Sequence, residues 1–264
     1  MIKISCRNRF SKRDFNIDYS TSKTELTAIY IFAATMKYKH IFFDLDHTLW
    51  DFETNSHETL LDLFEVYALD EIISDKHHFI SRYYYHNEIY WEQFRKGELS
   101  REDLRHIRFR TTLTEFKIHD EGLVKKLAVA YLEVLPTKTN LFHDTIHVLE
   151  ELVKKYSLHI ITNGFEEVQY KKIRNTGLEK YFKYIITSES AGSQKPEPAI
   201  FNYAMQLTNA EIKKSLFIGD SIEADINGAK AVGMDYVFYN PKKIPHTEIV
   251  MKEISSLTEL LQLL

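Results

Sequence analysis

The sequence contains a single cysteine, Cys6, among 264 residues. One thiol cannot form an intramolecular disulfide, and it excludes a zinc site built on several thiolates. A reducing, cytoplasmic setting is therefore expected. Long hydrophobic runs are also missing: the longest near the start, "LTAIYIFAAT" at 26–35, is about half of the ~20 residues needed to cross a bilayer. We expect no membrane partner.

The sequence also lacks an excess of positive charge. Its formal net charge is −4, whereas proteins that bind nucleic acid usually present a strongly basic face. We therefore expect no nucleic-acid polymer as a partner. The 44% hydrophobic and 27% charged residues are typical of a globular protein with a sizeable buried core. These totals leave the oligomeric state open.

The first 35 residues show no clear hydrophobic periodicity. The stretch "KYKHIFFDLD", which follows Met36, begins like a complete domain. We expect residues 1–35 to be a leader that is either disordered or the product of a misassigned start, with Met36 as the true start.

From His40 onward, short apolar runs alternate with amphipathic helical stretches. The sequence predicts strands at 40–46, 158–164, 184–189, 215–221 and 235–240, and helices at 145–156, 166–177 and 223–233. Nearly continuous apolar strands separated by helices are typical of a parallel sheet that is covered on both faces. The predicted fold class is therefore α/β, with a doubly wound parallel sheet.

A long, aromatic-rich helical interval separates the first two predicted strands. A crossover between parallel strands needs only about a dozen residues, so we interpret 53–138 as an inserted α-helical cap domain. The core domain then comprises 36–52 and 139–264. Within the insertion, Ser100 followed by Asp103 resembles a capping box and predicts a helix start.

Polar residues gather where the predicted strands end. They are Asp44 and Asp46 at the end of the first strand, Thr162 and Asn163 at the end of the second, and Asp220 and Ser221 at the end of the fourth, with Asp225 following. Ligands of open parallel sheets bind at this edge. Converging carboxylates repel one another without a cation, and oxygen ligands without a suitably spaced His or Cys pair favour Mg²⁺.

Because Mg²⁺ commonly shares its coordination sites with substrate phosphate, this arrangement indicates phosphoryl chemistry. Lys195, in "SQKPEP", would add a positive charge at the same edge. Side chains two apart in an extended segment point the same way, so Asp44 and Asp46 could reach one substrate. One carboxylate would attack phosphorus, and the other would transfer protons.

These motifs resemble those of the haloacid dehalogenase (HAD) superfamily of phosphohydrolases. The matching segments are "DLDHT" (44–48), Thr162 in "ITNG", Lys195 in "QKPEP" and "GDSIEAD" (219–225). The resemblance implies Asp44 as nucleophile, Asp46 as general acid and base, and Thr162, Asn163 and Lys195 as phosphate-binding residues. It also implies Mg²⁺ held by Asp44, Asp220 and the Asp46 carbonyl, supported by Asp225 and Ser221.

Within the superfamily, the insertion between the first two motifs is similar to a helical cap of the first type. The segments "IFFDLDHTLWDF" and "IITNGFEEVQYKKIRNTGL" look like the YjjG/YfnB-type branch, which is similar to pyrimidine 5'-nucleotidases. The resemblance implies a nucleotide as the small phosphorylated substrate. The alternatives are a sugar-phosphate phosphatase or phosphomutase, and a non-catalytic domain that would have lost a catalytic residue; all four motifs are present.

Aromatic residues near the motifs are candidate substrate contacts. We single out Trp50, Phe165 and Trp91, although the aromatics of 83–94 are also what the core of a cap would contain. For Arg95 and Arg108 we expect a solvated, ion-paired helix face rather than a substrate contact. Thr162 and Asn163 could instead cap the helix that follows them, a role compatible with binding phosphate.

Overall fold

The computed structural model describes residues 37–264, so the expected leader at 1–35 and Met36 lie outside the described residues. All strands of its six-stranded sheet run parallel, in the order β3-β2-β1-β4-β5-β6. The strands are β1 (His40–Phe43), β2 (Ser157–Thr162), β3 (Phe182–Thr187), β4 (Ser215–Gly219), β5 (Asp235–Tyr239) and β6 (Glu253–Ile254). The predicted parallel sheet is confirmed.

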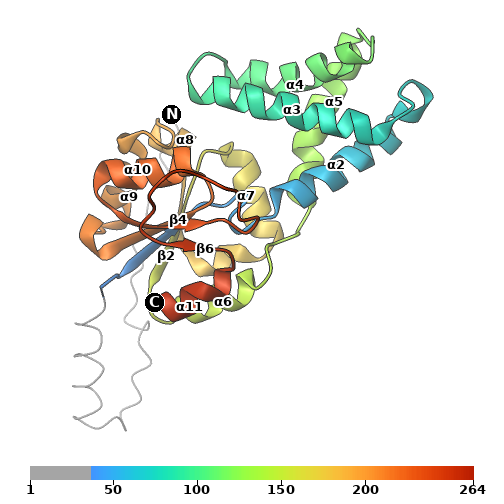
Figure 1. Ribbon diagram of the computed structural model, residues 1–264. Coiled ribbons are helices and arrows are strands. Elements are labelled where there is room, and N and C mark those ends of the chain that lie inside the picture. The colour runs from blue at the N-terminus through green and yellow to red at the C-terminus, as the bar shows by residue number, and fades with distance from the viewer. Residues whose placement is uncertain (1–36) are drawn as a thin grey trace, which may run out of the picture. The chain divides into compact units, whose positions relative to one another are not determined.

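Helices cover both faces of the sheet. The chain builds β1, β2 and β3 toward one edge, and then returns to place β4 on the other side of β1. Figure 1 shows α9 and α10 on one side of the sheet and α6 and α11 on the other. The helices of this part are α6 (Thr145–Leu152), α7 (Glu166–Asn175), α8 (Ser188–Ala191), α9 (Pro198–Thr208), α10 (Asn227–Val232) and α11 (Leu260–Leu263). The fold is doubly wound, as predicted.

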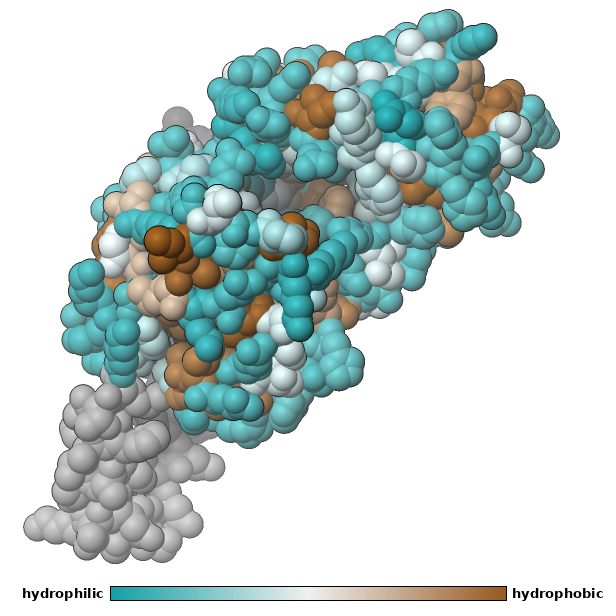
Figure 2. Space-filling model, in the orientation of Figure 1, coloured by the Kyte–Doolittle hydropathy of each residue, from teal (hydrophilic) through white to brown (hydrophobic). Residues whose placement is uncertain are grey.

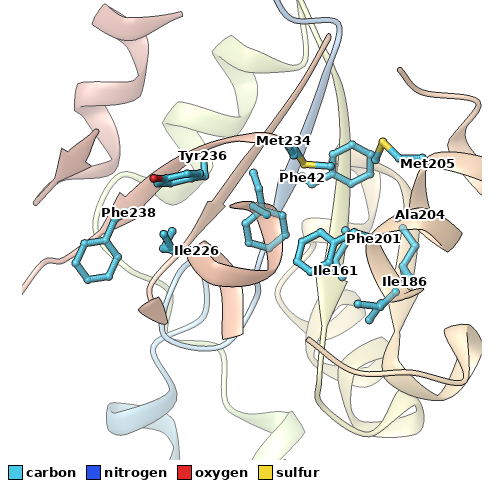
Figure 3. Close-up of a cluster of buried hydrophobic side chains, with 13 residues drawn as sticks. Phe42, Ile161, Ile186, Phe201, Ala204, Met205, Ile226, Met234, Tyr236 and Phe238 are labelled. Carbon is cyan, nitrogen blue, oxygen red and sulfur yellow. The ribbon is translucent and has the colours of Figure 1, made fainter. Parts of the chain in front are cut away.

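The sheet and α9 bury a continuous group of apolar side chains (Figure 3). Phe42 of β1, Phe217 of β4 and Phe201 of α9 are all fully buried, and the Phe201 and Phe217 rings lie 5.5 Å apart in an edge-to-face arrangement. Each fully buried side chain of this kind stabilises the fold by about 1.5–3 kcal/mol. Gly228 permits this packing, because a Cβ there would lie 2.4 Å from the Phe201 ring.

A helical insertion lies between β1 and β2. It consists mainly of α2 (Phe52–Val66), α3 (Lys76–Arg95), α4 (Arg101–Glu115) and α5 (Glu121–Val134). Each of these helices begins after a residue whose side chain accepts a hydrogen bond from a first-turn amide: Asp51, Asp75, Ser100 and Asp120. The predicted helix start after Ser100 is confirmed. The domain boundaries at 52/53 and 138/139 stay predictions.

The two chain segments that join the insertion to the sheet lie side by side. Trp50 and Leu141 form an antiparallel bridge, and the Phe142 amide donates to the Leu49 carbonyl at 3.0 Å. The Asp51 amide donates to the Asn140 carbonyl at 3.1 Å. The insertion therefore leaves and re-enters the sheet domain through one paired connection.

Four elements of the sheet domain were not among the predicted ones: strand β6 and helices α8, α9 and α11. Strand β6 has only two residues, too few to produce an alternating pattern. Helix α9 does carry a pattern: Ile200, Phe201, Ala204 and Met205 are buried, and Pro198 occupies its first turn, where proline is favoured. The predicted helix at 223–233 also differs, since a π-helical turn precedes α10.

Hydrophilic residues predominate on the face shown in Figure 2, with hydrophobic residues in separate patches. No helix within residues 37–264 combines the length and the hydrophobicity that a membrane span requires.

Two histidines meet at the amino-terminal end of β1 and β2. The His40 Nδ1 and His159 Nε2 atoms lie 3.1 Å apart, and the His159 ring stacks on Phe42 at 4.8 Å. Burial, and then the neighbouring His40 and Lys183, lower the pKa of His159 to about 3. His159 therefore stays neutral in the folded protein at pH values where an unfolded histidine is protonated.

This difference predicts an acid sensitivity of folding. The unfolded state binds the extra proton between the unfolded pKa of about 6.5 and the folded pKa, so stability falls as the pH is lowered through that window. The slope from one group is at most about 1.4 kcal/mol per pH unit. We expect His159→Gln to flatten the pH dependence of the unfolding free energy, measured by urea denaturation between about pH 6.5 and 4.5. His119→Gln, at an exposed position, is the control and should leave the slope unchanged.

Candidate active site

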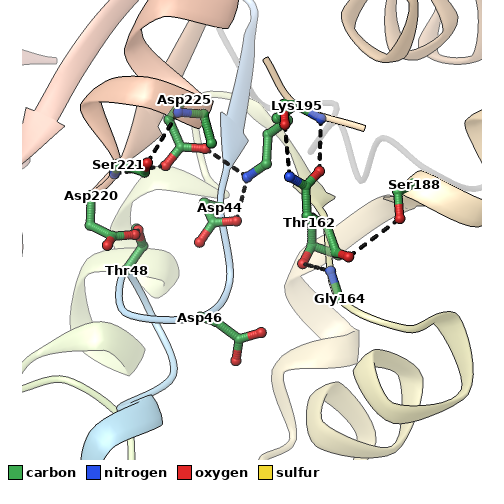
Figure 4. Close-up of polar contacts among 12 residues, drawn as sticks. Asp44, Asp46, Thr48, Thr162, Gly164, Ser188, Lys195, Asp220, Ser221 and Asp225 are labelled. Atoms are coloured by element: carbon green, nitrogen blue, oxygen red, sulfur yellow. Dashed lines mark hydrogen bonds and ion pairs between the residues drawn. The ribbon is translucent and has the colours of Figure 1, made fainter. Parts of the chain in front are cut away.

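Three carboxylates meet at the carboxyl end of the two central strands. One carboxylate oxygen from each of Asp44, Asp220 and Asp225 lies within 4.8 Å of the others. The register of β1 and β4 explains this, because Phe43 pairs with Ile218 and the next residues reach the same edge. Figure 4 shows the three side chains gathered there.

A buried lysine joins two of these carboxylates. Lys195 is only 2% exposed, and its Nζ lies 2.5 Å from Asp44 Oδ1 and 2.7 Å from Asp225 Oδ1. The Asn163 side chain holds the Lys195 backbone, accepting from its amide at 2.8 Å and donating to its carbonyl at 2.9 Å. The ends of β2 and β4 are thereby connected through the segment that precedes α9.

Further hydrogen bonds fix the carboxylates of Asp220 and Asp225. The Thr48 hydroxyl donates to Asp220 Oδ1 at 3.0 Å, and the Ser221 amide donates to Asp225 Oδ2 at 3.0 Å. Gly219 is required beside them, because a Cβ at that position would lie 2.3 Å from Asp225 Oδ2. Ser221 itself caps the following turn by accepting from the Ala224 amide.

The cluster carries more negative than positive charge. Burial raises the pKa of Asp44 well above its usual value, Lys195 opposes that rise, and Asp225 and Asp220 add to it. Burial and Asp225 raise the pKa of Asp220 to about 7. For Lys195, burial lowers the pKa, but Asp225 and Asp44 outweigh it and leave the pKa raised. One ammonium group thus faces three carboxylates.

This donor set fits a hard divalent cation. The cluster offers oxygen atoms, and Mg²⁺ prefers a few carboxylates together with water and substrate oxygens. Burial raises the two aspartate pKa values most, and a bound cation would relieve the carboxylate repulsion that adds to this effect. The third carboxylate of the cluster is that of Asp225, for which the resemblance implied a supporting role beside the metal.

The Asp46 carboxylate has partners of its own on α7 and lies apart from the cluster (Figure 4). Its Oδ1 accepts from Lys172 Nζ at 2.6 Å, and its Oδ2 accepts from Gln169 Nε2 at 2.8 Å. Lys172 is 2% exposed and lies 4.2 Å from the centre of the Trp50 ring. Burial lowers the pKa of Lys172, although Asp46 opposes this.

Gln169 and Lys172 were not predicted as site residues. They occupy the buried face of α7 together with Val168 and Ile173. The sequence did contain a signal for them, since both residues fall on the apolar face of an amphipathic helix. Glutamine and lysine are rarely buried without a polar partner, so this pattern indicates a polar contact. The Gln169 amide also donates to the Thr162 hydroxyl at 2.7 Å, which ties α7 to the end of β2.

A cavity of about 960 Å³ opens in front of both groups of residues. Its wall includes Asp44, Asp46, Thr162 and Lys195 from the sheet domain. From the insertion, α3 contributes one helical face, consisting of Tyr84, Asn87, Glu88, Trp91 and Arg95. The carboxylate cluster is therefore placed beneath a chamber large enough for a small organic molecule.

The predicted substrate contacts are placed differently from one another. Trp91 lines the cavity, whereas Trp50 is fully buried and donates through Nε1 to the Lys138 carbonyl at 3.3 Å. The expectation for Trp50 is thus wrong: the bridge to Leu141 turns its side chain into the interior. Phe165 is 5% exposed and packs against Trp91, with ring centres 5.5 Å apart.

One further expectation is corrected, and the phosphate-binding role of Asn163 stays a prediction. Arg108 was expected on a solvated face, but it is 2% exposed and donates to Asn87 Oδ1 at 2.8 Å. Asn163 lines the cavity, yet both ends of its side-chain amide are engaged by the Lys195 backbone. These two hydrogen bonds fix the backbone at Lys195.

The chain belongs to the family of haloacid dehalogenase-like hydrolases, whose model matches residues 38–233. It is 31% identical to the HAD-hydrolase YfnB of Bacillus subtilis, over 86% of this chain and 96% of that protein. It is also 30% identical to two pyrimidine 5'-nucleotidases. One is PynA of Streptococcus pneumoniae (81% of this chain, 89% of that protein), and the other is YjjG of Escherichia coli (87% and 99%).

The fold is likewise similar to the crystal structure of YfnB bound to magnesium. The TM-score is 0.77, and the match covers 86% of this chain and 98% of that chain. The resemblance inferred from the motifs is therefore confirmed at the level of the family and of these relatives.

The raised aspartate pKa values predict that metal binding depends on pH. Mg²⁺ binds ionised carboxylates, so below pH 7 it must displace the proton of Asp220. We expect the Mg²⁺ dissociation constant to rise by up to about tenfold per pH unit for each proton displaced, as the pH falls from about 8 to 6. Isothermal titration calorimetry would measure this. An affinity independent of pH would contradict the electrostatic description of the cluster.

Proposed function

We propose that this protein is a Mg²⁺-dependent phosphomonoester hydrolase. The observation that carries the proposal is the group of three carboxylates within 4.8 Å, with the buried Lys195 ammonium beside it, at the floor of a large cavity. A phosphoryl group needs cations and hydrogen-bond donors around its oxygens and a nucleophile opposite the leaving group. This edge of the sheet supplies both.

In the proposed reaction, an Asp44 carboxylate oxygen attacks phosphorus and forms an aspartyl-phosphate, while the bond to the leaving oxygen breaks. Asp46 donates its proton to that oxygen. Asp46 then removes a proton from water, which attacks the phosphorus and releases phosphate, so that both carboxyl groups return to their starting state. Lys195 and Thr162 both line the cavity, and we assign the ammonium group and the hydroxyl to binding the phosphoryl oxygens.

The residues assigned to hold Mg²⁺ are Asp44 and Asp220, with the backbone carbonyl of Asp46. Bound Mg²⁺ would neutralise the phosphoryl charge and the cluster together. Asp225 acts beside it by orienting Lys195, to which it is ion-paired at 2.7 Å. Ser221 supports this arrangement, because its amide holds the second Asp225 oxygen.

For the substrate, we propose a nucleoside 5'-monophosphate, with a pyrimidine base favoured. Two relatives that match over most of their length are named as pyrimidine 5'-nucleotidases. The α3 face that lines the cavity presents Trp91 for stacking, and Asn87 and Arg95 as polar groups. A sugar phosphate would use the same floor but would gain less from the aromatic wall.

Replacing the nucleophile should abolish turnover without unfolding the protein. Asp44→Asn keeps the side-chain shape and removes the attacking carboxylate, so we expect kcat to fall by at least about 10³-fold with little change in thermal stability. Asp70→Asn, at an exposed position of the insertion, is the matched control. EDTA should abolish the activity of the unaltered protein, and Mg²⁺ should restore it. Ordinary turnover by Asp44→Asn, once deamidation is excluded, would remove the mechanism.

A panel of phosphomonoesters tests the substrate class. We expect kcat/KM for pyrimidine nucleoside monophosphates to exceed that for sugar phosphates by at least about tenfold, because only the former can stack on Trp91. Trp91→Leu should lower the nucleotide value and leave the sugar-phosphate value within about twofold. A higher kcat/KM for sugar phosphates would be consistent with the proposed phosphatase activity but would contradict the proposed nucleotide substrate.

A further inference from the structure

A second, smaller cavity of about 40 Å³ lies next to the large one. The two share Asp46 and Trp91 as wall residues. The small cavity is lined from the insertion by Arg108 and Tyr131 and from α7 by Gln169 and Lys172. We call it the Arg108 recess. It exists only where the insertion meets the sheet domain.

Arg108 contributes an unused donor to this recess. The side chain is 2% exposed, and it donates through Nε to the Leu104 carbonyl at 2.9 Å and through Nη1 to Asn87 Oδ1 at 2.8 Å. Among the described residues, no group accepts from its buried Nη2. A buried charged donor without a partner costs more than one that is satisfied. The Nη2 atom therefore requires an acceptor that residues 37–264 do not supply.

Gln169 contributes an unused acceptor. It is fully buried, and its Nε2 donates both to Asp46 Oδ2 at 2.8 Å and to Thr162 Oγ1 at 2.7 Å. Its Oε1 receives no hydrogen bond from any group within residues 37–264. The reverse orientation of the amide would place Oε1 against the Asp46 carboxylate, so the arrangement with Nε2 toward Asp46 is the favoured one.

We propose that the Arg108 recess is a buried water site that links the insertion to the proposed proton-transfer residue Asp46. A water molecule accepts from Arg108 Nη2 and donates to Gln169 Oε1, and thus satisfies both atoms. Each buried water needs about 10–15 Å³ on the same measure of cavity volume, so 40 Å³ accommodates about three or four. A small anion would satisfy Arg108 but would face the Gln169 oxygen and the Asp46 carboxylate.

The water gives Arg108 a role in positioning Asp46. By occupying Gln169 Oε1, it fixes the amide with Nε2 toward Asp46, so the carboxylate keeps one orientation. Arg108 belongs to α4, and Gln169 to α7, so this support is complete only when the insertion is seated on the sheet domain. The catalytic consequence rests on the proposed phosphatase function, whereas the water site itself does not.

A crystal structure of the unaltered protein tests the site directly. At about 1.5 Å resolution we expect an ordered water within about 3.2 Å of both Arg108 Nη2 and Gln169 Oε1. Crystals soaked in bromide should show no anomalous peak in the recess. A bromide peak, a recess without ordered water, or a direct contact between Arg108 and Gln169 would each overturn the water site.

Steady-state kinetics test the positioning role. Arg108→Met retains the length and apolar packing but removes the donors, and we expect kcat to fall by about tenfold with KM within about twofold. Arg108→Lys, which keeps a donor for the water, should recover most of the loss. Arg110→Met is the matched control, because Arg110 lies on the same helix and pairs with Glu121 at the exposed surface. It should leave both constants unchanged.

An unchanged kcat in folded Arg108→Met overturns the positioning role. If Arg108→Met fails to fold, the decisive variant is Gln169→Met. It removes both the Oε1 atom that accepts from the water and the Nε2 atom that donates to Asp46, so kcat should fall at least as far as is expected for Arg108→Met. Turnover of no phosphomonoester by the unaltered protein would reject the proposed function instead, and the crystallographic result would still decide the water site.

Discussion

The active-site edge depends on one buried ion pair network, in which Lys195 lies between Asp44 and Asp225. Burying these groups costs free energy unless each finds its partner, so the positions of the strand ends, the Lys195 segment and the turn after β4 are mutually constrained. One ammonium cannot balance three carboxylates. The residual repulsion makes this edge a place for a cation and, in our proposal, for a phosphoryl group.

A second constraint separates Asp46 from this network, although only Leu45 stands between it and Asp44 in the sequence. Lys172 and Gln169 hold the Asp46 carboxylate on the α7 side. The two neighbouring carboxylates thereby have different electrostatic surroundings. Asp44 shares Lys195 with Asp225, whereas Asp46 has an ion pair of its own with Lys172. Two acidic groups need different surroundings if one is to act as nucleophile and the other is to transfer protons.

Much of this site was predictable because its residues follow strands in a recognisable order. The ends of β1, β2 and β4 could be read from apolar runs, and parallel strands must bring Asp44, Thr162 and Asp220 to one edge. The partners on α7 could not be assigned in this way. Which face of that helix meets Asp46 depends on packing, and Trp50 was misassigned because its bridge to Leu141, distant in sequence, decides where its ring points.

By itself, the sequence determined the fold class, the family and the motif residues, since these depend on local periodicity, strand-end position and short spacings. Tertiary structure alone decided that Lys195 lies between Asp44 and Asp225, that Lys172 and Gln169 hold Asp46, and that Arg108 is buried beside them. The physical reason is that a side chain's charge partners and burial are set by groups far away along the chain. The hydrophobic pattern of the sequence does not indicate these partners, because the contacts form only when the insertion and the sheet domain pack together.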